Sequence, residues 1–372
     1  MNDLQDIIKA EIARTGPISF ARFMEVALYC PIFGYYERQD VSPGQMGDFY
    51  TSVSVGELFG ELLANQFSEW LLNADRGARN AEGQIVEAGA HDGRLAADIL
   101  RWMRHEREEL FASLKYWILE PSPLRRLAQQ ENLAEFAESV QWYESWQQVP
   151  ASGVNGIIFS NELLDAMPVH RLGWDATKKE WFEWGVTWQN DHFAWVRLSR
   201  DATRSALRTP HSALPTELLD VLPDGFITEI CPAALDWWRD AARALKAGKL
   251  MTIDYGLKAE QFFTPERKDG TLRAYHQHHQ SNDLLANPGE QDLTAHVNFT
   301  AIQSAGEAEG LKTEIFTTQR QFLTHIIEKN CCDNPTVKEW TSSRVRQFQT
   351  LTHPEHLGQR FHVLVQGRGW FT

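Results

Sequence analysis

The sequence of 372 residues lacks any stretch of about 18 uncharged apolar residues, so it predicts no membrane-spanning helix. Its N-terminus is acidic and has no apolar core segment, so we expect no signal peptide. Cysteine is scarce: there are four, and none lies in a C-x-x-C pair. This argues against a disulfide framework and fits a reducing compartment. We therefore expect a protein of the bacterial cytoplasm.

Basic residues are also few, with 36 Lys and Arg against 50 Asp and Glu, and the formal net charge is -14. Such a surface repels phosphate groups, which disfavours nucleic acids and anionic membranes as partners. It suits a basic partner such as an Arg-rich protein segment.

A G-x-S-x-G motif is missing, so no hydrolase nucleophile can be named. His276, His278 and His279 lie close together but without an H-E-x-x-H pattern, so we expect no metal site.

What the sequence does contain is an alternation of apolar strand segments with helical segments from residue 84 onward. This pattern predicts an α/β fold with a mostly parallel sheet and helices on both faces. The strands are expected near residues 84–87, 116–120, 140–142, 156–160, 249–255, 312–316 and 361–366.

Two segments interrupt this alternation. Residues 170–230 are rich in tryptophan and alternate with period two, which predicts an inserted antiparallel hairpin, and residues 256–308 are polar with little periodicity. We expect an N-terminal helical lid region over residues 1–80, with Ser19 capping its second helix. The α/β domain then covers residues 81–372 and includes both insertions.

The first candidate site follows the first strand. Glu87 ends this strand and a turn with Gly89, His91 and Gly93 comes next, where a ligand can approach the backbone and the free N–H groups of a helix. His91 breaks the G-x-G-x-x-G pattern of dinucleotide sites. Glu120 ends the second strand, where a carboxylate can hold ribose hydroxyls. The two carboxylates favour S-adenosylmethionine over NAD as the cofactor, since Glu87 suits an ammonium or sulfonium group; an ordinary strand-to-helix turn is the alternative.

A second candidate site follows the strand at 156–160. Asn161, Glu162 and Asp165 lie at the sheet edge where ligands bind in open α/β folds, and they suit a cationic or amine substrate. The structural alternative is a helix N-terminus with Asn161 as the cap and Glu162 in the first turn, which explains Asp165 less well.

These motifs together resemble the MidA-type family of S-adenosylmethionine-dependent methyltransferases, which includes a mitochondrial protein arginine methyltransferase that assists the assembly of respiratory complex I. The similarity spans nearly the whole chain, and it is the combination of motifs that is specific. The matching segments are residues 16–20, 34–36, 47–52, 59–62, 87–93, 161–169, 253–256, 270–274 and 292–297.

The resemblance implies a Rossmann-like class I methyltransferase with a seven-stranded sheet, S-adenosylmethionine as cofactor and an N-terminal lid that includes Gly47, Asp48 and Thr51. It also implies a protein substrate, with a subunit of a respiratory complex as a candidate.

Methyl transfer is an in-line displacement that depends mainly on alignment of the acceptor. For an arginine acceptor, Glu162 and Asp165 can hold the guanidinium while Asn161 orients it.

Four residues in three motifs differ from the family pattern. His91 lies in a turn that usually reads G-P-G-x-G, Val53 and Ser54 stand where Pro-Glu is usual, and Asn298 stands where aspartate is common. Two alternatives stay open, and the differences at His91, Val53 and Ser54 motivate the first of them. One is an assembly factor with this fold that has little or no turnover and binds a partner protein. The other is a small-molecule methyltransferase whose 170–230 insertion closes a Trp-lined pocket.

Overall fold

The computed structural model describes residues 3–38, 51–74, 83–199, 220–276, 279–281, 283–333 and 340–370. The chain forms two compact units. The first consists of Met1–Phe49, Leu164–Trp237 and Gly256–Ala305, and the second of Tyr50–Leu163, Trp238–Tyr255 and Gly306–Thr372. The predicted boundary at residue 80, between the N-terminal lid region and the α/β domain, stays a prediction.

A large sheet runs through the second unit, with the strand order β15-β16-β10-β5-β2-β3-β4. Neighbours from β10 to β4 are parallel, and β16 runs antiparallel to β10 and β15. This confirms the expected mostly parallel sheet; a two-residue strand, β14, also pairs with the end of β10. The strands are β2 (Gln84–Ala88), β3 (Lys115–Leu119), β4 (Val140–Tyr143), β5 (Val154–Asn161), β10 (Leu245–Leu257), β14 (Val297–Asn298), β15 (Lys312–Thr318) and β16 (Phe361–Arg368).

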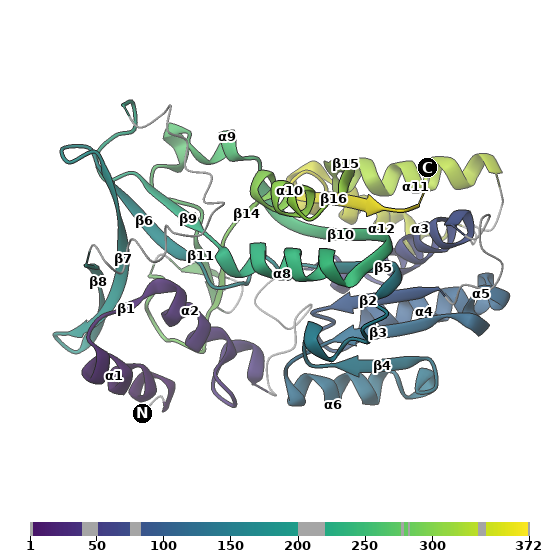
Figure 1. Cartoon of the computed structure of the whole chain (residues 1–372), viewed down its shortest axis with the longest axis horizontal. Coiled ribbons are helices and arrows are strands. Elements are labelled where there is room, and N and C mark those ends of the chain that lie inside the picture. The colour runs from purple at the N-terminus through teal and green to yellow at the C-terminus, as the bar shows by residue number, and fades with distance from the viewer. Residues whose placement is uncertain are drawn as a thin grey trace. The chain divides into compact units, whose positions relative to one another are not determined.

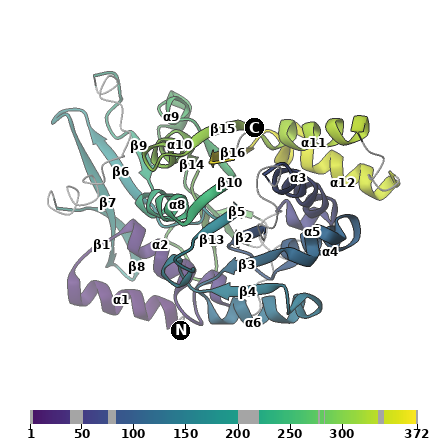
Figure 2. The same cartoon turned by 45° about the vertical axis from the view of Figure 1, so that its right-hand side comes forward.

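The central strands are apolar on both faces because helices cover both sides of a parallel sheet. Ile85, Val86, Ile157 and Ile158 are fully buried. Figures 1 and 2 show β2, β3 and β4 side by side with α4 and α6 alongside them. The helices are α3 (Leu58–Ala74), α4 (Arg94–Glu106), α5 (Glu108–Ser113), α6 (Pro123–Asn132), α8 (Pro232–Ala244), α11 (Gln319–Asp333) and α12 (Ser342–Thr352).

The first unit contains two antiparallel sheets. One has the order β1-β7-β6-β9 with β8 beside β7, and the other has the order β12-β11-β13. The Trp-rich segment accordingly forms hairpins from β6 to β8. The strands are β1 (Ile18–Ser19), β6 (His170–Asp175), β7 (Glu180–Gln189), β8 (His192–Arg197), β9 (Ile227–Ile230), β11 (Arg273–His276), β12 (His279–Ser281) and β13 (Asp292–Thr294).

Helices α1 (Asp3–Thr15) and α2 (Phe20–Tyr29) pack in this unit, and α9 (Ala259–Phe262) and α10 (Phe299–Ala308) lie in the later insertion. The Ser19 hydroxyl accepts a hydrogen bond from the Arg22 N–H at 3.1 Å, which confirms the predicted N-cap of α2. The apolar face of α2, including Phe20, Phe23 and Met24, is fully buried. Within the described ranges, no helix has the length and apolar character needed to cross a membrane.

Candidate functional site

The turn after β2 is built from residues in the left-handed backbone region. Gly89, His91 and Gly93 have φ values of 72°, 48° and 85°. A Cβ on Gly89 would lie 2.9 Å from Leu163 Cδ1, so close packing as well as backbone conformation requires glycine there. Gly93 is the N-cap of α4, and the Asp92 carboxylate just before it accepts a hydrogen bond from the Arg94 N–H at 3.2 Å. The other N–H groups of the first turn can donate to an anionic ligand group, such as the carboxylate of an amino acid, although the Asp92 carboxylate lies at the same end of the helix.

Glu120 follows β3 and is only 7% exposed. The Ser122 N–H donates to its Oε1 at 3.0 Å and the Gln129 side-chain amide donates to its Oε2 at 3.1 Å. The same amide donates to the His91 carbonyl at 3.0 Å. One side chain of α6 therefore joins the carboxylate at the end of β3 to the turn at the end of β2.

The His91 ring is directed to α6. Its Nε2 lies 2.8 Å from Arg125 Nη1, and because a guanidinium can only donate, the imidazole nitrogen accepts. The ring is therefore neutral with its proton on Nδ1, which lies 3.8 Å from the Asp92 carboxylate. Burial lowers the pKa of His91, in agreement with this assignment.

Glu87 is 3% exposed, and the Tyr116 hydroxyl donates to its Oε2 at 2.5 Å. Burial raises the pKa of Glu87 to about 8, although the Tyr116 hydrogen bond opposes the shift. At neutral pH this side chain therefore carries a proton in the described state. That Glu87 contacts an ammonium or sulfonium group of the ligand stays a prediction.

The end of β5 is a second cluster. Glu162 has a φ of 53°, and its N–H donates to the Ile253 carbonyl at 2.9 Å. Its Oε1 accepts from the Ser52 N–H at 3.0 Å and from the Asn161 amide at 3.1 Å. The structure thus brings Asn161 and Glu162 together with the segment that follows Thr51. Gly47 and Asp48, the other expected lid residues, lie outside the described residues.

Asp254, near the end of β10, belongs to the same cluster. It is fully buried, and its carboxylate accepts from the N–H groups of Leu163 and Tyr255 at 3.2 and 2.8 Å. Sequence reasoning did not select this residue, although an acid near the end of a predicted strand was a signal for it. Gln129 was also missed, and its polar side chain in a helix gave no comparable signal.

Asp165 belongs to the first unit. It is 8% exposed, and its carbonyl accepts from the Ala295 N–H at 2.9 Å. Its predicted partnership with Glu162 around a substrate stays a prediction.

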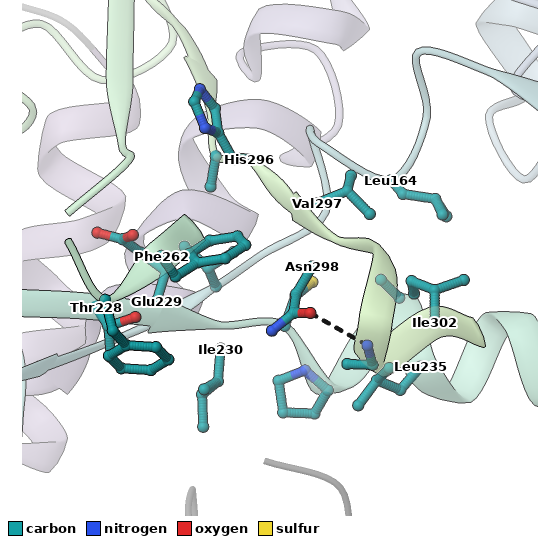
Figure 3. A pocket seen from close by; sticks show the side chains of 17 residues that line it. Leu164, Thr228, Glu229, Ile230, Leu235, Phe262, His296, Val297, Asn298 and Ile302 are labelled. Carbon is teal, nitrogen blue, oxygen red and sulfur yellow. Dashed lines mark hydrogen bonds between the residues drawn. The ribbon is translucent and has the colours of Figure 1, made fainter. Parts of the chain in front are cut away.

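The first unit also contains a pocket, shown in Figure 3. Its walls are mostly apolar and include Phe262, Phe263, Leu235 and Ile302, and its volume of about 50 Å³ suits a small group rather than a nucleoside. The Asn298 oxygen accepts from the Ala301 N–H at 3.1 Å, which fixes the amide with its nitrogen toward the pocket (Figure 3).

The residues at the ends of β2 and β3 in the second unit are compatible with S-adenosylmethionine as a ligand. Glu120 is a buried carboxylate oriented by hydrogen bonds from Ser122 and Gln129, and α4 begins at the adjacent turn. His91 is compatible with this site because Arg125 engages its ring. Among the described residues, no group of three His, Cys, Asp or Glu side chains could hold a metal ion.

A mostly parallel sheet with a glycine turn and an acidic residue at neighbouring strand ends defines a cofactor-binding α/β enzyme. The chain belongs to the Methyltransf_28 family of S-adenosyl-L-methionine-dependent methyltransferases, whose sequence profile matches residues 62–317. The predicted class of enzyme and its cofactor, S-adenosylmethionine, are thereby confirmed.

Similar proteins cover nearly the whole chain. The protein named protein arginine methyltransferase NDUFAF7, mitochondrial, from Rattus norvegicus is 28% identical over 382 residues, which are 95% of this chain and 81% of that protein. Its homolog from Drosophila melanogaster is 28% identical over 405 residues, 97% of this chain and 84% of that protein. A solved structure of a COG1565 superfamily member from Burkholderia thailandensis, bound to S-adenosyl-homocysteine, has a TM-score of 0.82 at 28% identity and covers 100% of this chain and 93% of that chain.

Proposed function

We propose that this enzyme transfers a methyl group from S-adenosylmethionine to an arginine side chain of a protein. The observation that carries the proposal is that relatives named protein arginine methyltransferase align with 95% or more of this chain. The net charge of -14 supports a basic substrate segment. We further propose that the enzyme acts in the bacterial cytoplasm, with a respiratory complex subunit as a candidate substrate.

We propose the following roles for the residues of the two clusters in the second unit. When bound, S-adenosylmethionine supplies an electrophilic methyl group. Glu120 and the turn that contains Gly89 and Gly93 hold the cofactor. Glu87 lies near the end of β2, the strand that leads into this turn. We propose that the seven strands from β15 to β4 form the class I methyltransferase sheet, and that β14 is an addition to it.

Glu162 is proposed to hold the guanidinium of the substrate, with Asn161 orienting it and Asp165 as a second carboxylate. The support is that Glu162 Oε1 already accepts two hydrogen bonds, which fix the direction of the carboxylate. A carboxylate with a fixed direction aligns a guanidinium at low entropic cost. Thr51 lies beside this cluster, and with Gly47 and Asp48 it is proposed to form the lid.

The small-molecule alternative requires a closed Trp-lined pocket. The pocket of the first unit includes no tryptophan among its lining residues. This pocket therefore gives no support to the small-molecule alternative.

The test is incubation of the purified enzyme with methyl-labelled S-adenosylmethionine and an arginine-containing peptide library, beside a library with lysine in place of arginine. We expect label in methylarginine from the first library only, and loss of this label in Glu162→Gln. Glu144→Gln, which changes a carboxylate whose side chain is 55% exposed, serves as the control. Saturable binding of S-adenosylhomocysteine without transfer of label would instead support the assembly factor, and label in small molecules would support the other alternative.

A further inference from the structure

We propose that Gln129 is a positioning residue for S-adenosylmethionine, because its side-chain amide holds the Glu120 carboxylate and the 89–93 turn in one arrangement. The inference rests on the proposed roles of Glu120 and this turn in binding the cofactor. Gln129 lies in α6, and its side chain is fully buried.

Every hydrogen-bonding group of this amide has a partner. The nitrogen donates to Glu120 Oε2 at 3.1 Å and to the His91 carbonyl at 3.0 Å, and the oxygen accepts from Trp142 Nε1–H at 3.0 Å. The assignment of nitrogen and oxygen follows from the partners, because an indole N–H can only donate and the other two oxygens accept.

Gln129 joins two neighbouring parts of the proposed cofactor site. β2 and β3 are adjacent parallel strands, so the turn and Glu120 are neighbouring parts of one edge of the sheet. The turn contains His91 in a left-handed conformation, which an L-residue adopts only when its surroundings hold it there. Gln129 fixes the carbonyl of this residue and the direction of the carboxylate together, so its loss is expected to loosen both contacts at once.

The α6 helix provides a matched control. Asn132 donates from its side chain to the Asp92 carbonyl at 2.8 Å, so it makes one hydrogen bond from the same helix to the same turn, but it does not contact Glu120. A change at Asn132 therefore reports the cost of losing a bond to the turn alone.

The experiment is calorimetric titration of the full chain with S-adenosylhomocysteine. Gln129→Met keeps the length of the side chain but removes its hydrogen bonds to Glu120, the His91 carbonyl and Trp142 Nε1–H, and it is expected to raise Kd roughly ten- to hundred-fold. Asn132→Ala is expected to change Kd by no more than about twofold. A folded Gln129→Met protein with the affinity of the natural chain would overturn the positioning role.

A second variant separates positioning from a general loss of stability. In Gln129→Glu, an ionised carboxylate repels Glu120, whereas the protonated form donates its O–H to Glu120. The affinity of this variant for S-adenosylhomocysteine should therefore improve as the pH falls from about 8 to about 5.5, by roughly tenfold more than in the natural chain. A purely structural role predicts the same pH profile in both proteins, which would contradict the inference.

Glu120→Ala distinguishes failure of the proposed cofactor site from failure of the positioning role of Gln129. If this variant binds S-adenosylhomocysteine normally, the proposed cofactor site is wrong and the role of Gln129 falls with it. If Glu120→Ala loses binding and Gln129→Met does not, only the positioning role is overturned.

Discussion

The second unit contains two strand-end clusters that look alike locally but are assembled differently. Each includes a residue other than glycine in the left-handed region, His91 with φ 48° and Glu162 with φ 53°. The side chains of other segments that hydrogen-bond to the turn after β2 come from residues 34 to 40 positions away, all in α6. At the end of β5, Glu162 accepts from a residue 110 positions away, and the Leu163 N–H donates to one 91 positions away. The first cluster is thus the product of one local segment, and the second requires distant segments to meet.

The two clusters also differ in how far along the chain the donors to their carboxylates lie. Glu87 accepts from Tyr116, 29 positions away, and Glu120 accepts from Ser122 and Gln129, 2 and 9 positions away. Glu162 accepts from its neighbour Asn161 but also from Ser52, and Asp254 accepts from its neighbour Tyr255 but also from Leu163, 91 positions away. We therefore expect changes in the first cluster to affect cofactor binding or titration, and changes in the second to affect stability as well as turnover.

The largest expected effect is on cofactor affinity. Glu120→Ala removes the proposed acceptor of the ribose hydroxyls, and the Kd for S-adenosylhomocysteine should rise at least about 100-fold, measured by calorimetry. Glu144→Ala, at the end of the adjacent strand β4, removes an exposed carboxylate paired with Arg126 at 2.8 Å and should leave Kd unchanged. Equal affinities of Glu120→Ala and Glu144→Ala for S-adenosylhomocysteine would contradict the role of Glu120 in binding the cofactor.

The next effect is on the pH dependence of stability. Burial raises the pKa of Glu87 from 4.5 to about 8, so between these values the folded state holds a proton that the unfolded state has released. Stability from this group is complete below about pH 4.5 and falls as the pH rises, by about 1.4 kcal/mol per unit.

Glu87→Gln does not titrate and removes this contribution. Between about pH 5.5 and 7.5, the free energy of unfolding of the natural chain should fall by about 2.7 kcal/mol more than that of the variant, measured by urea unfolding. Any constant offset between the two proteins leaves this difference unaffected. Parallel pH profiles would show that Glu87 is ionised in the folded state.

A somewhat smaller effect is expected at the end of β5. Glu162→Ala leaves the Ser52 N–H and the Asn161 amide without their acceptor, and the free energy of unfolding should fall by about 2 kcal/mol. Glu162→Gln keeps an oxygen at this position and should lose less than about 1 kcal/mol. Equal losses in denaturant titrations of the two variants would mean that the hydrogen bond to Ser52 does not stabilise the fold.

The smallest effect concerns Ser52 itself. Its hydroxyl donates to Gln319 Oε1 at 3.1 Å in a buried environment, and Ser52→Ala should lower the free energy of unfolding by about 1 kcal/mol. Ser54→Ala removes a local bond to the Thr51 carbonyl at 2.7 Å and should cost less, because the partners are neighbours in the same turn. Denaturant unfolding of both variants measures the difference, and a larger loss in Ser54→Ala would contradict the role of long-range contacts.

The sequence by itself determined the mostly parallel α/β sheet, the Ser19 cap and the acids at the ends of β2 and β3. These features depend on periodicity and on residues close together in the chain, so they can be recognised locally. The family motifs added the class of enzyme and its cofactor.

Only the tertiary structure decided the partners of these residues. That Gln129 contacts both Glu120 and the His91 carbonyl, that Glu162 accepts from Ser52, and that Asp254 supports Leu163 all depend on which segments pack together. A hydrogen bond between residues about 100 positions apart leaves no periodic trace in the sequence, because it depends on chain reversals and strand register that the whole core specifies.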